Sequence, residues 1–126
     1  MQGDFVEHKD VLESLSVNCS LVKKTSELTD LDGLIIPGGE STTIKKLIDR
    51  YGFESAIKDK INSGMSLWGT CAGLICIANK LTESDPIPMK IINAEVSRNW
   101  FGRQVDSFES NIKFTGIQEN KTRKIK

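Results

Sequence analysis

The chain has 126 residues, of which 38% are hydrophobic and 27% are charged, and its zero formal net charge suits one ordinary globular domain. Four of the 17 basic residues lie in the last six positions, so the rest of the chain is mildly acidic and we expect no nucleic-acid partner. No apolar run reaches the roughly 18 residues of a membrane span, and three cysteines without a CxxC pair favour a reducing cytoplasm over disulfides or zinc.

The N-terminal part predicts a helix followed by two strands. The helix is amphipathic, because a stripe recurs at steps of three and four through Phe5, His8, Leu12 and Leu15. We expect His8, near this stripe, to be a packed histidine rather than a catalytic one. The stretch "CSLVKK" (19–24) is a short strand candidate, and "LDGLIIPGG" (31–39) has the compact apolar run of a buried parallel strand.

The remainder predicts three helices and three strands. Residues 40–52 predict a helix that Ser41 or Thr42 caps and Gly52 ends. After it we expect a helix at 53–64, a strand at 65–68, a turn at 69–73, an apolar helix at 74–81, a loop at 82–88, a strand at 89–96 and a half-buried strand at 107–114.

Strands and helices therefore alternate along the chain. This order predicts an α/β fold with a mostly parallel sheet and helices on both faces. We expect residues 1–126 to form a single, partial domain. The chain opens at a strand-to-helix turn with no strand before it and closes on a divergent, lysine-rich tail (117–126) that we expect to be disordered, so the domain looks incomplete at both ends.

The turn "GTCAG" (69–73) has the form of a nucleophile elbow with cysteine in the serine position. Such a turn needs small flanking residues, because the strand and the following helix would otherwise collide. Cys71 would lie at a helix N-terminus, which favours a thiolate. The N–H of Ala72 would point at the oxygen of a tetrahedral intermediate. Cys76, one helical turn later, is expected to be a buried small hydrophobe.

The stretch "PGGES" (37–41) ends the other strong strand. Because neighbouring parallel strands end at one edge of the sheet, this turn would face the same crevice as Cys71. Gly39 could supply a second oxyanion N–H, and Glu40 and Ser41 could contact a small polar ligand. Taken alone, the stretch is equally compatible with a plain Pro-Gly turn and a helix cap.

The two motifs together, about thirty residues apart, resemble the class I glutamine amidotransferases. The segment "RNWFGRQVDSFES" (98–110), with "QGDFVEH" and "PGGESTT", closely resembles the glutaminase subunits of pyridoxal 5′-phosphate synthase. The resemblance implies a flavodoxin-like fold and hydrolysis of L-glutamine to glutamate and ammonia, which passes to a separate synthase subunit. It implies neither a metal nor an organic cofactor.

Carried over residue by residue, the resemblance implies that Cys71 is the nucleophile and that L-glutamine is bound by Gly39, Glu40, Ser41 and Arg98. Arginine suits this role, because its planar fork can hold a carboxylate through two hydrogen bonds. Sequence alone would favour an exposed ion pair for Arg98. Gln2 and Gly3 match the family's turn near the oxyanion region and the synthase contact.

The family's catalytic histidine and glutamate lie in a His-Pro-Glu motif, and another glutamine-binding segment reads Ile-Arg-Ala-Pro. Neither motif occurs in this sequence, and His8 matches a family histidine that is not catalytic. We therefore expect a fragment that is inactive by itself. The alternatives are a non-catalytic remnant that only binds the synthase, and a glutaminase of another amidotransferase branch serving imidazole or purine synthesis.

Overall fold

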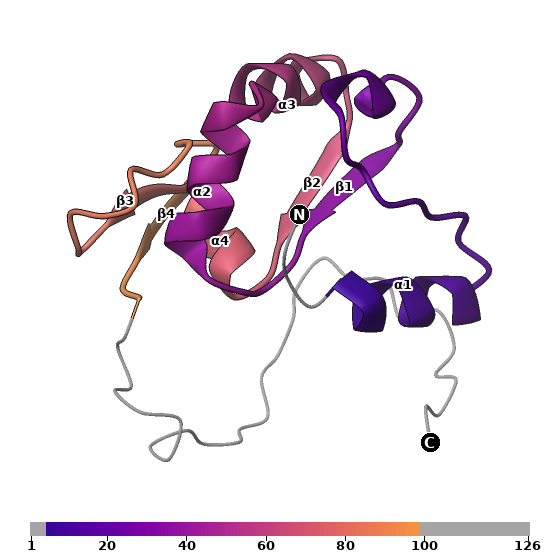
Figure 1. Cartoon of the computed structure of the whole chain (residues 1–126), viewed down its shortest axis with the longest axis horizontal. Coiled ribbons are helices and arrows are strands. Elements are labelled where there is room, and N and C mark those ends of the chain that lie inside the picture. The colour runs from indigo at the N-terminus through magenta and orange to yellow at the C-terminus, as the bar shows by residue number, and fades with distance from the viewer. Residues whose placement is uncertain (1–4, 99–126) are drawn as a thin grey trace.

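The computed structural model describes residues 5–98, which form an alternating series of helices and strands (Figure 1). The half-buried strand expected at 107–114 lies outside the described residues. In chain order the elements are α1 (Phe5–Ser14), the 3-10 helix η1 (Thr25–Leu28), β1 (Gly33–Ile36), α2 (Ser41–Arg50), α3 (Phe53–Asn62), β2 (Ser66–Gly69), α4 (Ala72–Ile77), β3 (Ala78–Leu81) and β4 (Ile92–Val96).

The strands pair in parallel, as the alternating order predicts. In the described part of the chain, β1 pairs with β2 and β3 pairs with β4, and each pair is a separate ladder. The register of the first pair sets Ile36 opposite Gly69, so the segments that follow β1 and β2 leave from the same end of the ladder. This end is where both sequence motifs lie.

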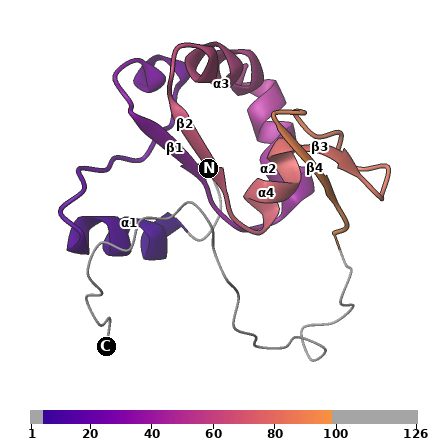
Figure 2. The ribbon, with the colours of Figure 1, turned by 180° about the vertical axis from the view of Figure 1, so that it is seen from behind.

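The two faces of the β1–β2 ladder have different environments. Leu34 and Ile36 point into a core shared with α2, α3 and α4, and Ile36 is only 1% exposed. On the opposite face Trp68 is 59% exposed and meets the edge of the His8 ring from α1. Both views of the ribbon accordingly place α1 apart from α2 and α4 (Figures 1 and 2).

Residues 19–24 do not form the predicted strand. They lead without strand pairing into η1, whose Leu28 is fully buried. The prediction was wrong because it rested on apolar residues alone, and a strand also needs a neighbour for its backbone groups. Leu21 is 43% exposed, so the stretch does not bury its apolar side chains as a core strand would.

The apolar helix expected at 74–81 is also different in the structure. The helix occupies Ala72–Ile77 and passes directly into β3. An apolar run of this length suits either element, and tertiary pairing decides between them. Lys80 of β3 lies opposite Glu95 of β4, with 3.0 Å between Nζ and Oε1. The expected strand at 89–96 is shortened to Ile92–Val96, because the N–H groups of Met89 and Ile91 bond the last carbonyls of α4 instead.

Helices α2 and α3 begin and end within two residues of their predicted bounds. Lys45 ties them together, because its buried ammonium contacts Asp49 at 2.5 Å and Glu54 at 3.0 Å. Glu54 in turn bonds Lys58. In the described ranges, no helix has both the length and the apolar character needed to cross a bilayer.

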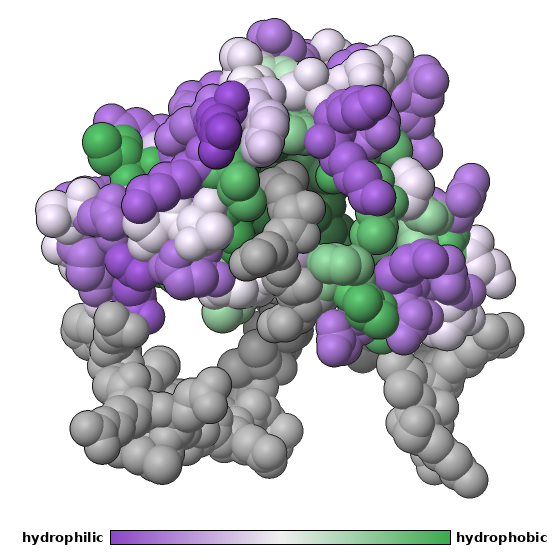
Figure 3. Space-filling view, viewed as in Figure 1, coloured by the Kyte–Doolittle hydropathy of each residue, from purple (hydrophilic) through white to green (hydrophobic). Residues whose placement is uncertain are grey.

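Helix α1 is the least buried of the four α-helices. None of the residues Phe5–Ser14 is buried, and Val6 and Val11 are 52% and 53% exposed. Leu15, which was expected on the apolar stripe, follows the helix and is 56% exposed. Figure 3 shows the resulting hydrophobic surface beside α1. Within residues 5–98, the body of α1 therefore adds little to the core.

The start of α4 lies against the end of β1 with no room for a side chain at Gly73. A Cβ placed on Gly73 would lie 1.8 Å from the carbonyl oxygen of Ile36, and one placed on Gly69 would lie 2.6 Å from the Gly73 carbonyl carbon. Real Cβ atoms do not come this near to backbone. The requirement for small residues on both sides of the cysteine turn is thus confirmed as a steric fact.

We predict that Gly73→Ala destabilises the fold by about 3 kcal/mol or more, at or above the upper end of the range for an overpacked core. The clash is with backbone, which cannot move aside as a flexible side chain can. Urea unfolding followed by circular dichroism measures the change.

The matched control is Gly33→Ala. A Cβ on Gly33 would meet Ser66 at an ordinary 3.6 Å, and alanine suits a strand better than glycine. This variant should be as stable as the parent or slightly more so. Equal stability of the two variants would contradict the steric account.

Candidate active site

The turn between β2 and α4 has the geometry of a nucleophile elbow. Cys71 adopts φ 51° and ψ −115°, which is rare for a residue with a side chain and costs about 1–3 kcal/mol. The turn holds this conformation by hydrogen bonds on both sides of the cysteine. The Thr70 N–H donates to the Ile36 carbonyl at 3.0 Å, and the Gly73 N–H donates to the Thr70 carbonyl at 2.9 Å. The Cys71 side chain is exposed.

The other two cysteines have different surroundings. Cys76 is fully buried, and burial raises the pKa of its thiol to about 11. Its Sγ donates to the Ser41 carbonyl at 3.6 Å, which joins α4 to the start of α2. Cys19 is half-buried. The expectation of a buried Cys76 is confirmed, and Cys71 is the most exposed of the three cysteines.

The "PGGES" turn begins α2, and its capping residue is Glu40. The carboxylate of Glu40 accepts the N–H of Thr42 at 3.1 Å and that of Thr43 at 2.6 Å. Hydrogen bonds from Thr43 and then Thr42 lower the pKa of Glu40 to about 2. The prediction that Ser41 or Thr42 caps the helix is therefore wrong, because the glutamate one position earlier reaches the free amides. Ser41 itself is buried.

Arg98 forms an ion pair with Glu40 of this turn, although 58 positions separate the two residues. Its Nη2 lies 3.5 Å from Glu40 Oε1, and its Nη1 donates to the Asp85 carbonyl at 2.7 Å. The main-chain N–H of Arg98 donates to both carboxylate oxygens of Glu83 at 3.1 Å. The arginine side chain is 26% exposed, so it is held on the protein rather than free in solvent.

The structure thus brings the predicted residues together in two steps. The Ile36–Gly69 register places the segment with Gly39 and Glu40 at the same end of the ladder as Cys71 and Ala72, and the ion pair adds Arg98 to Glu40. Among the described residues, the hydrogen bonds of Arg98 go to the 83–85 loop and not to the elbow. Gln2, Gly3 and the segment 99–110 lie outside the described residues.

Sequence reasoning did not foresee what three residues do at this site. Glu83 fixes the backbone of Arg98, Thr70 anchors the elbow, and His8 bonds Thr70. The expectation of a packed, half-buried His8 is confirmed, but its partner could not be foreseen. The position of Thr70 beside the cysteine was the one available signal.

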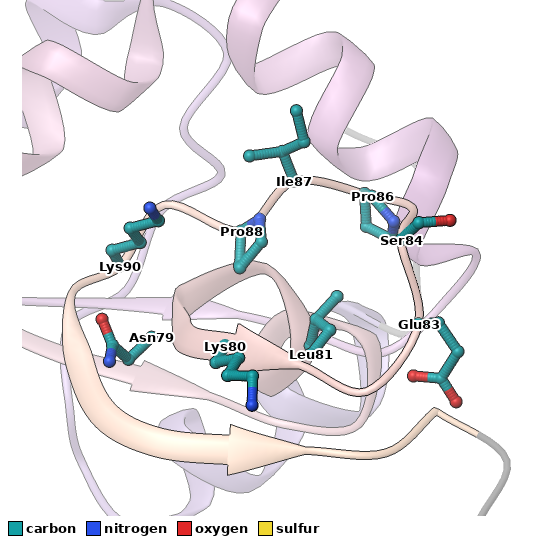
Figure 4. Close-up of a pocket in the computed structure, with 9 residues that line it drawn as sticks. All are labelled: Asn79, Lys80, Leu81, Glu83, Ser84, Pro86, Ile87, Pro88 and Lys90. Carbon is teal, nitrogen blue, oxygen red and sulfur yellow. The ribbon is translucent and has the colours of Figure 1, made fainter.

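A pocket of about 380 Å³ lies elsewhere. It is open and is lined by β3 and the loop after it, with Lys80, Glu83 and Ile87 among its residues (Figure 4). None of the predicted site residues lines it, although Glu83 connects its rim to Arg98. Within residues 5–98 no group of three metal-binding side chains is gathered.

The sequence matches the SNO glutamine amidotransferase family over residues 1–125. It is 47% identical over 121 residues to "Pyridoxal 5′-phosphate synthase subunit PdxT" of Dehalococcoides mccartyi, covering 94% of this chain and 62% of the relative. A subunit of the same name from Niallia circulans is 47% identical over 117 residues, covering 93% and 62%. The chain thus spans less than two thirds of the length of these relatives.

A solved structure described as "Crystal structure of glutamine amidotransferase" matches with a TM-score of 0.79 and 44% identity. The match covers 86% of this chain and 59% of that structure. It confirms the flavodoxin-like α/β fold class that the sequence predicts.

We predict that Glu40→Gln destabilises the protein near neutral pH, because the amide keeps only part of the cap and loses its charge. The folded-state pKa is depressed, so the stabilisation by the carboxylate is fully present above pH 4.5 and disappears as the pH falls towards 2. Urea midpoints at a series of pH values test this. The gap between parent and variant should narrow over that interval. Glu7→Gln, in the exposed first turn of α1, is the control for the loss of a carboxylate, and near neutral pH it should leave the urea midpoint close to that of the parent.

Proposed function

Because this chain belongs to the SNO glutamine amidotransferase family, we propose that it is the nucleophile-bearing part of a glutaminase that hydrolyses L-glutamine to glutamate and ammonia. The observation that carries the proposal is the elbow. An exposed cysteine sits in a strained turn at the end of β2, next to the "PGGES" turn at the end of β1.

The chemistry assigns Cys71 the role of nucleophile. Its thiolate attacks the γ-carboxamide carbon of glutamine, and the N–H groups of Gly39 and Ala72 stabilise the negative oxygen of the tetrahedral intermediate. The carbon–nitrogen bond then breaks, and a protonated base gives its proton to the departing ammonia. Water attacks the resulting glutamyl thioester, which releases glutamate and restores the thiol.

The turn that carries Glu40 and Ser41, together with Arg98, binds the amino-acid end of the substrate. Arg98 is already oriented by Asp85 and Glu83, so little side-chain freedom is lost when its guanidinium takes the α-carboxylate. Glu40 remains ionised at neutral pH and offers a negative charge for the α-ammonium group. No metal or organic cofactor takes part.

The base is a histidine that this sequence does not contain. The one histidine of the chain, His8, is bonded to Thr70 and serves the elbow rather than the leaving group. We place the base in the part of the relatives that this chain does not match, so the 126-residue chain alone does not turn over glutamine. Ammonia would pass to the synthase subunit of pyridoxal 5′-phosphate synthase, in the cytoplasm, where three free cysteines are chemically compatible.

The test joins this chain to the unmatched parts of the Dehalococcoides relative. Mixed with the synthase subunit of that organism, the extended protein should release ammonia from L-glutamine, and Cys71→Ala should abolish the release. The 126-residue chain should release none, since the loss of a catalytic partner removes several powers of ten in rate. Turnover by the short chain that depends on Cys71 would refute our placement of the base. Binding of the synthase without turnover by the extended protein would favour a non-catalytic docking role.

In the extended protein, Arg98→Lys should weaken glutamine binding by about 1–3 kcal/mol, the scale of a charge-assisted hydrogen bond. Lysine keeps the charge but loses the fork that Asp85 orients. Calorimetric titration with L-glutamine on a Cys71→Ala background measures the affinity without turnover. Lys58→Arg, on the outer side of α3, is the matched control and should bind as the parent does. Unchanged affinity in Arg98→Lys would make the arginine purely structural.

A further inference from the structure

We propose that His8 is a positioning residue for the nucleophile. Through Thr70 it holds the strained elbow in the conformation that presents Cys71 to solvent. The role rests on the proposed function for its biological meaning, but the geometry that supports it does not involve glutamine. His8 acts through another residue and is not itself the base.

The first support is a long-range hydrogen bond. His8 Nε2 and Thr70 Oγ1 lie 2.9 Å apart, and 62 positions separate the two residues. The direction of the bond depends on the histidine tautomer, and a threonine hydroxyl can satisfy either one. The bond is half-buried, so water competes with it less than at an open surface.

The second support is the way the imidazole is held. Its ring meets Trp68 edge-on, with centroids 6.0 Å apart and planes at 72°. Trp68 lies in β2 and Thr70 directly follows that strand, and the imidazole of His8 contacts both residues. The indole therefore orients the same ring whose nitrogen bonds the threonine.

The third support is that the N–H, the carbonyl and the hydroxyl of Thr70 are all hydrogen-bonded. Its N–H bonds β1 at Ile36, its carbonyl accepts the Gly73 N–H from α4, and its hydroxyl bonds α1 at His8. Three separate elements thus fix the residue directly before Cys71. A strained residue persists only where its surroundings over-determine it, and Cys71 at φ 51° is such a residue.

The bond to Thr70 is also a specific link between α1 and the elbow. None of the residues Phe5–Ser14 is buried, so the helix adds little to the core. Its one specific side-chain bond to the β1–β2 ladder region among the described residues is the bond to Thr70.

The test measures how fast iodoacetamide alkylates Cys71 in the 126-residue chain, by mass mapping at several times. His8→Phe keeps a ring against Trp68 but removes the hydrogen bond, and it should slow alkylation about three- to tenfold, the effect of one hydrogen bond. A relaxed turn lets Cys71 leave the conformation that projects its thiol outward. His8→Gln places an amide nitrogen where Nε2 stood and should restore most of the rate.

A second pair probes the same bond from the other side. Thr70→Val removes the hydroxyl at nearly constant shape and should slow alkylation as His8→Phe does, whereas Thr70→Ser should not. The double variant of His8→Phe and Thr70→Val should be no slower than either single variant, because one bond is lost in each case.

Alkylation of Cys76 reports whether each variant is folded, because that thiol is fully buried. If Cys76 becomes reactive in His8→Phe, that variant is not properly folded, and the comparison of Thr70→Val with Thr70→Ser then tests the role of the hydrogen bond. An unchanged or faster Cys71 rate in folded Thr70→Val overturns the proposal, and so do additive effects in the double variant. Iodoacetamide reports on the thiol alone, so these results stand whether or not the extended protein releases ammonia.

Discussion

The contact between the Gly73 backbone and the carbonyl of Ile36 is the constraint on which the rest of the site depends. With no side chain at Gly73, the start of α4 can rest directly on the end of β1. That approach lets the same Ile36 carbonyl take the N–H of Thr70. Cys71, which lies between Thr70 and Gly73, must then adopt a positive φ, and its side chain is exposed. Steric compactness, rather than any attraction to the thiol, creates the position of Cys71.

Local patterns were sufficient to predict much of this arrangement. The apolar spacing of α2 and α3 and the compact run of β1 are strong signals, because burial of one face dictates them. The elbow could be recognised because no residue with a side chain fits at the positions of its two glycines. The failures were at places where long-range pairing decides. Residues 78–81 carry an apolar pattern that suits a helix, and only the presence of β4 makes them a strand.

The site residues show the same division. Cys71 and Glu40 lie in short motifs with a mechanical reason for each position. The connections of Arg98 to Glu40 and of His8 to Thr70 cross large stretches of chain, and no local rule predicts which surface helix meets which turn. The sequence predicts that Glu40 binds a ligand, whereas its role as the cap of α2 depends on its carboxylate reaching the free N–H groups of Thr42 and Thr43. One carboxylate thus links the stability of α2 to the charge beside Arg98.

The direct passage of α4 into β3 limits where this protein can change its length. From Gly69 to Leu81 the chain is strand end, turn, helix and strand without a connecting loop. One added residue in α4 would rotate everything beyond it by about 100° and move Ala78 and Leu81 off their buried side. A deletion would pull Lys80 out of register with Glu95. Insertions are far easier to accommodate in the exposed stretch around Val17–Leu21, which takes part in no ladder. The segment that carries Cys71 therefore has a length that the pairing of β2 and β3 fixes from both ends.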